Sequence, residues 1–223
     1  MVVMSDYLNQ LLQLFRKHFA ERRYSYMSLL LGIFCFPLLM AYLTKTAVTP
    51  ATMYVAMWMI SIVVILHIST SWLRNRYTLI IANTLPVSVG VKYSFIMINS
   101  IVTSALLFFV CYLPSLALAK MLFPPAPEFD WVFADIIFLT NYKTYLGILA
   151  THGVLLLVNL VGRRRIYLVY LLAAVAVALV QIVIGKYIDV EWREGVKMIG
   201  NILLIFVAWI GGYFILRNYQ IKG

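Results

Sequence analysis

The histidines within apolar stretches are the first candidates for chemistry in this sequence. His67 and His152 both lie in long apolar runs. A zinc site needs at least three nitrogen, sulfur or oxygen ligands from the protein, and neither histidine has such neighbours at a suitable spacing. A lone histidine in such a run is more typical of a packed, neutral hydrogen-bond donor. The sequence therefore predicts no metal site and no catalytic residues.

Amides and hydroxyls in the same runs form a second set of candidates. Asn99 and Thr103 are four residues apart and share a helical face, and Asn159 lies seven residues after His152. These four residues are possible polar contacts along a substrate path. We favour the alternative that such groups hydrogen-bond between helices, where each contributes about 0.6–2 kcal/mol in a membrane.

Carboxylates and nucleotide-binding motifs limit the chemistry further. All eight acidic residues lie outside the apolar runs. Carriers coupled to protons or sodium usually need carboxylates within the membrane, so the sequence argues against that class. The chain contains no G-x-x-x-x-G-K-[ST] phosphate loop, and Cys35 and Cys111 do not form a C-x-x-C motif. The sequence therefore predicts no hydrolysis of ATP by this chain and no bound cofactor.

The elements that carry these residues are predicted to be membrane-spanning helices. Apolar residues make up 64% of the 223 residues and charged residues only 12%, whereas a soluble domain is about 25% charged. The runs are long enough to cross the hydrocarbon of a bilayer. The fold predicted is an all-α membrane protein with six transmembrane helices, at Met27–Leu43, Ala51–Leu73, Val91–Ala119, Tyr145–Val161, Ile166–Gly185 and Met198–Leu216.

The basic residues predict the orientation of these helices. If the N-terminus is cytoplasmic, twelve of the 18 Lys and Arg residues fall in cytoplasmic segments, among them Arg163, Arg164 and Arg165. Cytoplasmic loops carry the excess of Lys and Arg, so both termini are expected in the cytoplasm of a multi-pass protein of the cytoplasmic (inner) membrane. The net charge of +10 then reflects topology and attraction to anionic membrane lipids, and no nucleic-acid partner is implied.

The N-terminal segment has the pattern of an amphipathic helix. Leu8, Leu11, Leu12, Phe15 and Phe19 follow helical spacing. Such a helix is expected to lie in the inner membrane interface before the first span, either as a simple anchor or as a binding site for a partner. The sequence thus divides into residues 1–26, a cytoplasmic amphipathic helix, and residues 27–223, a six-span domain.

A second amphipathic segment lies between the second and third predicted spans. Tyr77, Ile80, Ile81 and Thr84 mark one helical face, and Pro86 is expected to end that helix. Ser88 is then a candidate N-cap for the third span. A surface loop is the plainer interpretation. Near the C-terminus, the adjacent Gly211 and Gly212 permit close helix approach, either at a dimer interface or within the chain.

The segment around Pro86 resembles that of a known family. Asn83-Thr84-Leu85-Pro86-Val87-Ser88, followed by Gly90-Val91-Lys92-Tyr93, is similar to the sLPVSR…iv.aKy segment of ABC-2-type transporter permeases. The number of predicted spans and the N-terminal helix also match that family. The sequence differs in having Val89 after the serine, and Arg74 to Arg76 where an acidic residue is common.

The resemblance implies a function and partners. Such permeases are the six-span halves of ATP-driven exporters, and they form homodimers or heterodimers with a second permease. Each copy engages a cytoplasmic ABC ATPase, which binds the ATP and Mg. By position, the ATPase-coupling segment here is Asn75, Arg76, Tyr77, Ile80, Ile81, Thr84, Leu85, Pro86, Val87 and Ser88. The substrate expected is amphipathic or hydrophobic: a peptide, lipid or drug.

Two other functions compete with export. The first is that of a non-transporting accessory or immunity subunit of a larger membrane complex. A membrane-embedded, lipid-modifying enzyme is the third alternative, but it would need clustered acids, a Ser/His or Cys/His arrangement, or metal ligands. Replacement of both His67 and His152 tests that enzyme hypothesis.

Overall fold

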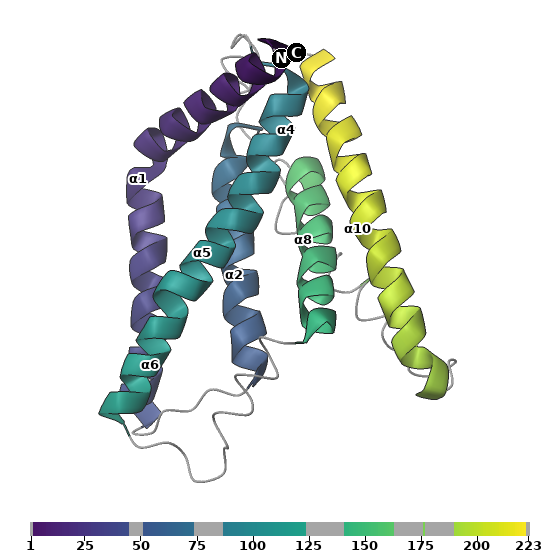
Figure 1. Cartoon of the computed structure of the whole chain (residues 1–223). Helices are drawn as coiled ribbons and strands as arrows, with labels where there is room; N and C mark the ends of the chain where they lie inside the picture. The colour runs from purple at the N-terminus through teal and green to yellow at the C-terminus, as the bar shows by residue number, and fades with distance from the viewer. Residues whose placement is uncertain are drawn as a thin grey trace. The chain divides into compact units, whose positions relative to one another are not determined.

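The computed structural model describes residues 2–44, 51–73, 87–123, 141–162, 176 and 190–221. Within these ranges the protein is almost entirely helical and contains no strand. Figure 1 shows the helices in chain order. The prediction of an all-α fold is confirmed for this part of the chain.

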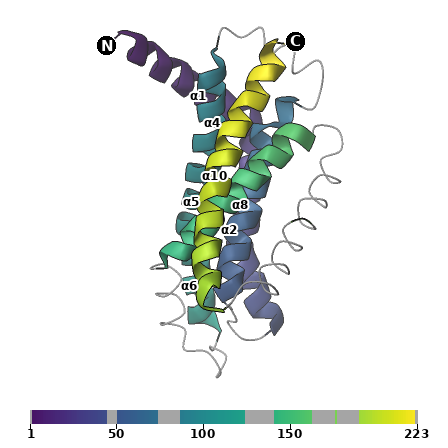
Figure 2. The ribbon, with the colours of Figure 1, turned by 90° about the vertical axis from the view of Figure 1, so that its right-hand side faces the viewer.

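The first helix, α1 (Val2–Thr44), combines the predicted amphipathic segment and the first predicted span. Its backbone leaves helical geometry at Arg22, where φ is −113° and ψ is 15°. The helix bends there, so its first half points away from the axis of its second half (Figures 1 and 2). The boundary that we predicted after residue 26 lies four residues beyond this break.

The second helix, α2 (Ala51–Ser69), is the most uniformly apolar of the described helices. A single 3₁₀ turn, η1 (Ser71–Leu73), follows it, and the amide of Leu73 donates to the carbonyl of Thr70. Helix α2 thus covers most of the second predicted span, Ala51–Leu73.

One long helical rod runs from Val89 to Leu122 and contains the third predicted span. It consists of α4 (Val89–Ile98), the π-helical η2 (Asn99–Thr103), α5 (Ser104–Leu107), the π-helical η3 (Phe108–Tyr112) and α6 (Leu113–Leu122). Ser88 caps it as predicted, because its Oγ accepts a hydrogen bond from the amide of Val91 at 3.3 Å. Pro114 is the second residue of α6, and the helix continues beyond it to Leu122.

The remaining described helices are α8 (Tyr142–Gly162) and α10 (Val190–Ile221). Helix α8 matches the fourth predicted span, and α10 contains the sixth. The fifth predicted span, Ile166–Gly185, lies outside the described residues except for residue 176. Of residues 123–141, a stretch that includes Pro124, Pro125 and Pro127, only Phe123 and Asn141 are described.

Four described helices are long and apolar enough to cross a membrane: Asp6–Leu43, Val89–Leu122, Tyr142–Gly162 and Trp192–Tyr219. The part of α2 from Val55 to Ser69 is apolar but shorter. These helices indicate a membrane protein. The full set of six spans stays a prediction.

The chain forms two compact units, which we describe separately. The first contains residues 1–69 and 94–144, and in it α1 and α2 pack against the rod from η2 to α6. The second contains residues 70–93 and 145–223, and in it α8 packs against α10. The units are interleaved in sequence, since the boundary between them falls within the Val89–Leu122 rod and again within α8.

Candidate functional site

A buried polar cluster joins the three helical segments of the first unit. The Nδ2 of Asn99 donates to the Tyr26 hydroxyl of α1 at 2.6 Å and to the Ser69 hydroxyl of α2 at 2.7 Å. The Oδ1 of Asn99 accepts a hydrogen bond from Thr103 Oγ1 at 2.9 Å. We call Tyr26, Ser69, Asn99 and Thr103 the Asn99 junction. Asn99 and Ser69 are fully buried.

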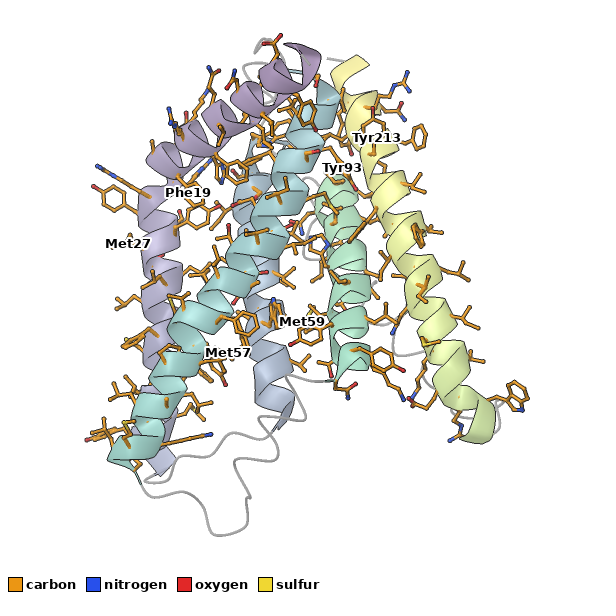
Figure 3. The ribbon with its side chains drawn as sticks, in the orientation of Figure 1. Phe19, Met27, Met57, Met59, Tyr93 and Tyr213 are labelled. Atoms are coloured by element: carbon orange, nitrogen blue, oxygen red, sulfur yellow. The ribbon has the colours of Figure 1, made fainter. Side chains whose placement is uncertain are left out.

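Aromatic side chains extend the Asn99 junction toward the N-terminus. His18 Nε2 lies 3.0 Å from the Tyr26 hydroxyl. The rings of Phe15 and His18 each meet the edge of Phe95, with centroids 4.9 Å apart. Ser94, the residue directly before Phe95, hydrogen-bonds to the Tyr7 hydroxyl at 2.6 Å. The first half of α1 is therefore attached to the start of the rod along most of its length, and Phe19 marks this face in Figure 3.

The Asn99 junction coincides with a local change in helix geometry. Residues Asn99–Thr103 form the π-helical turn η2. A π turn contains one more residue than an α turn, and such turns occur frequently at functional sites. Here the wider turn carries Asn99 and Thr103, whose side chains bond to each other while Asn99 also reaches two other helices. The rod is thus least regular where it makes its polar contacts.

A second π turn carries an aromatic stack. Trp58 of α2 stacks on Phe108 of η3 with centroids 4.9 Å apart, and Phe108 stacks on Tyr112 at 5.3 Å. The indole nitrogen of Trp58 donates to Ser104 Oγ at 3.3 Å. Below this stack, Ser115 donates to the Phe34 carbonyl of α1, three residues before Pro37. The carbonyls before a proline lose helical partners, and a neighbouring hydroxyl satisfies them.

The other two predicted substrate-path residues lie in the second unit. His152 is fully buried, and its ring meets the edge of Trp209 at 6.2 Å. Asn159 is buried as well; its Oδ1 accepts from Thr70 at 3.4 Å, and its Nδ2 donates to the Leu155 carbonyl at 2.8 Å. Asn159 thus bonds both within α8 and to the residue that follows α2. The preferred interpretation, hydrogen bonding between segments, fits Asn99 and Asn159.

Small residues bring α8 and α10 into close contact. A Cβ atom on Gly153 would lie 2.9 Å from the Cβ of Ala208. A Cβ atom on Gly212 would lie 3.3 Å from a methyl group of Leu160 and 3.4 Å from the Tyr93 hydroxyl. Tyr93 also donates to the Trp209 carbonyl and meets the edge of Tyr213 (Figure 3). Of the two interpretations of Gly212, close packing within the chain is the one observed.

The predicted interfacial residues of α1 divide between two faces. Leu11 is buried and Phe15 partly buried, whereas Leu8 and Leu12 are exposed. Phe19 is 37% exposed, and its ring meets Phe15 and Tyr26. The inward-facing residues contact the first unit, and the outward-facing ones are available to lipid.

Most of the predicted coupling segment lies outside the described residues. Asn75, Arg76, Tyr77, Ile80, Ile81, Thr84, Leu85 and Pro86 all belong to that part of the chain. Val87 and Ser88 are described, and Ser88 caps α4.

The side chains described above take part in hydrogen bonding and packing between helices. Among them, no three His, Cys, Asp or Glu side chains gather where they could hold a metal ion. The Asn99 junction contains amide, hydroxyl and phenol groups, and it links α1 to α2 and the rod. Its geometry suits a joint that keeps three helices in register.

Comparisons with protein-family models, curated proteins and solved structures gave no match. The function of the protein is therefore inferred from its own residues.

Sequence reasoning missed the partners of Asn99. Tyr26 is 73 residues away from Asn99, and nothing in local spacing pairs them. A weaker signal was present in α1, where His18, Arg22 and Tyr26 recur every four residues and so share one polar face beside the apolar one. The two π turns had no sequence signal that we could identify.

Proposed function

We propose that this chain is the permease subunit of an ATP-binding-cassette exporter, powered by a separate ATPase. The observation that carries the proposal is the Asn83–Tyr93 string, which resembles ABC-2-type permeases and whose Ser88 caps α4. The cap attaches the end of the coupling segment to the rod that runs to Leu122. A displacement of residues 75–88 by an ATPase would then tilt a whole membrane helix, a rigid-body response common in switching proteins.

The charge distribution supports an external energy source. No acidic residue lies within the apolar runs, so a proton or sodium ion has no carboxylate to bind on its way through them. The chain also lacks a phosphate loop. Work for transport would therefore come from ATP and Mg bound by the partner. In this proposal the permease acts as a homodimer or heterodimer in the cytoplasmic membrane, with both termini cytoplasmic and six spans per copy.

The Asn99 junction has a role in this mechanism. It ties α1 and α2 to the rod 11 residues after the Ser88 cap. Movement of the coupling segment would reach α1 through this contact. The substrate that the resemblance implies is amphipathic or hydrophobic, such as a peptide, lipid or drug.

The test combines association and transport. The tagged chain is purified from its native membranes, and an associated ABC ATPase is identified by its own phosphate loop. We expect the Ile80→Glu/Ile81→Glu variant to insert normally but to lose the ATPase and ATP-dependent transport in reconstituted vesicles. The matched control is Met121→Glu/Leu122→Glu, an adjacent pair of exposed apolar residues at the other end of the rod.

Three outcomes contradict the proposal. One is an Ile80→Glu/Ile81→Glu variant that keeps its ATPase and full transport. Another is a control variant that loses both to the same extent. A third is a complex with an ATPase whose hydrolysis no peptide, lipid or drug stimulates, which would favour the accessory or immunity role.

A further inference from the structure

The outward face of α1 carries a basic patch at the bend. Arg16, Lys17, Arg22 and Arg23 are all exposed and lie within eight residues. Glu21 is the acidic residue among them, and its carboxylate lies 3.8 Å from the Lys17 ammonium. The patch therefore keeps an excess of positive charge.

The opposite face of the same segment is already filled. Leu11 is buried, and Phe15 and His18 contact Phe95. Arg16 lies in the first half of α1 and Arg23 directly after the break at Arg22, and both side chains are exposed. Their charges are thus presented to the surroundings of the first unit.

Exposed apolar side chains flank the basic patch along the helix. Leu12 is 55% exposed on the N-terminal side, and Met27 and Leu31 are 64% and 62% exposed on the other. Met27, labelled in Figure 3, lies one turn beyond Arg23, at the start of the first predicted span. This order of cations followed by apolar residues matches a phospholipid, whose charged headgroup continues into acyl chains.

Arg23 is held in position by its neighbour. Its guanidinium carbon lies 4.8 Å from the centre of the Tyr24 ring, and its Nη2 donates to the Tyr24 hydroxyl at 3.0 Å. A guanidinium has five N–H donors in a planar fork, so those not used by Tyr24 remain available for phosphate oxygens. Tyrosine is itself common at the membrane interface.

We propose that the basic patch at the α1 bend binds the headgroup of an anionic membrane phospholipid. Arg16 and Arg23 bind the phosphate, and the acyl chains lie along Met27 and Leu31. An acidic protein surface would satisfy the charges but would leave the flanking apolar residues exposed. A lipid covers both. This inference does not depend on the exporter proposal, because it needs no ATPase.

The experiment measures lipid selectivity of the full-length chain. The protein is reconstituted with phosphatidylcholine containing a fraction of phosphatidylglycerol, and retained lipids are counted by native mass spectrometry. Each basic residue near an anionic surface contributes about fivefold to lipid binding. We therefore expect Arg16→Gln/Arg23→Gln, which removes two such residues, to lower the ratio of phosphatidylglycerol to phosphatidylcholine by about 25-fold.

Two further variants make the result specific. Arg193→Gln/Lys197→Gln removes the same charge at the start of α10 and is expected to keep the wild-type ratio. Arg16→Lys/Arg23→Lys keeps the charge and is expected to retain part of the selectivity.

The inference is overturned if Arg16→Gln/Arg23→Gln retains phosphatidylglycerol as the wild type does. It is also overturned if the α10 control loses as much, since net charge alone would then explain the effect. Unchanged lipid selectivity with loss of a protein partner would assign the patch to that partner instead.

Discussion

At the scale of single residues, the side chain of Asn99 bonds to three other side chains at once. It donates to Tyr26 and Ser69 and accepts from Thr103, and it is fully buried. An amide in this position cannot replace these bonds with water. Its contribution is therefore directional: it favours one rotational setting of α1 and α2 around the rod.

We expect Asn99→Leu to lower the free energy of unfolding by about 1–2 kcal/mol, because the Tyr26 hydroxyl loses a buried partner. Thermal unfolding in detergent measures the change. The matched control is Thr151→Val, whose hydroxyl bonds within α8 at an exposed position, and it is expected to change stability by less than about 0.5 kcal/mol. In a Tyr26→Phe background, Asn99→Leu should lower the free energy of unfolding by less than it does in the wild type. An equal decrease in both backgrounds would argue against the hydrogen bond between Asn99 and Tyr26.

Residue identity alone identified Asn99 and Thr103 but not their partners. Their spacing of four predicted a shared face, and the structure confirms that the two side chains bond to each other. The choice of Tyr26 depends on where α1 bends and on the wider turn at Asn99–Thr103. No proline or glycine marks the bend of α1 or the wider turn at Asn99–Thr103. The periodicity of apolar residues therefore does not predict either feature.

At the scale of elements, the contact between α8 and α10 depends on side chains that are absent or small. Figure 2 shows the two helices crossing. Gly153 lies where a methyl group would come within 2.9 Å of the Ala208 Cβ. Close backbone approach of this kind is a major source of helix association in membranes, where both lipid and side chains are apolar.

We expect Gly153→Ala to destabilise the protein by about 1–3 kcal/mol, because the helices must separate to admit the methyl group. Gly147→Ala is the control on the same helix, since its added Cβ meets no atom within 4 Å; there the better helix propensity of alanine should leave stability equal or higher. Addition of Ala208→Gly should recover much of the loss. The free energies of unfolding of the purified variants test this prediction. A Gly153→Ala protein as stable as Gly147→Ala would contradict the close packing of α8 on α10.

Element positions were the most predictable part of the fold. The long apolar runs coincide with the helices α2 and α8 and with the apolar part of α10, because a sequence suited to the hydrocarbon forms an uninterrupted apolar helix. The ends were less predictable. Helix α10 begins eight residues before the predicted span, with Trp192, Arg193 and Glu194 already helical, since polar residues continue a helix freely outside the lipid.

At the scale of the whole molecule, orientation is the property on which the exporter proposal most depends. Six spans would return the C-terminus to the side of the N-terminus, and the excess of basic residues favours the cytoplasm for both. Cys35 and Cys111 are the two native cysteines. Their replacement by alanine gives a background in which single cysteines report on the side of the membrane.

In that background we expect a membrane-impermeant maleimide to label Pro125→Cys in intact cells. Ser5→Cys and Lys222→Cys should react only after the cells are opened, because the basic segments remain on the cytoplasmic side. Labelling of Lys222→Cys in intact cells together with protection of Ser5→Cys would exclude an even number of spans.

The break at Arg22 has a consequence for how the N-terminal segment tolerates change over evolution. In an unbroken helix, an insertion or deletion near the start would rotate every later side chain by about 100° per residue. Here the irregular backbone at Arg22 can absorb such a rotation before it reaches Tyr26 or Pro37. The first half of α1 can therefore take the rotation that its contacts with Ser94 and Phe95 require, while the lipid-spanning portion keeps its own alignment.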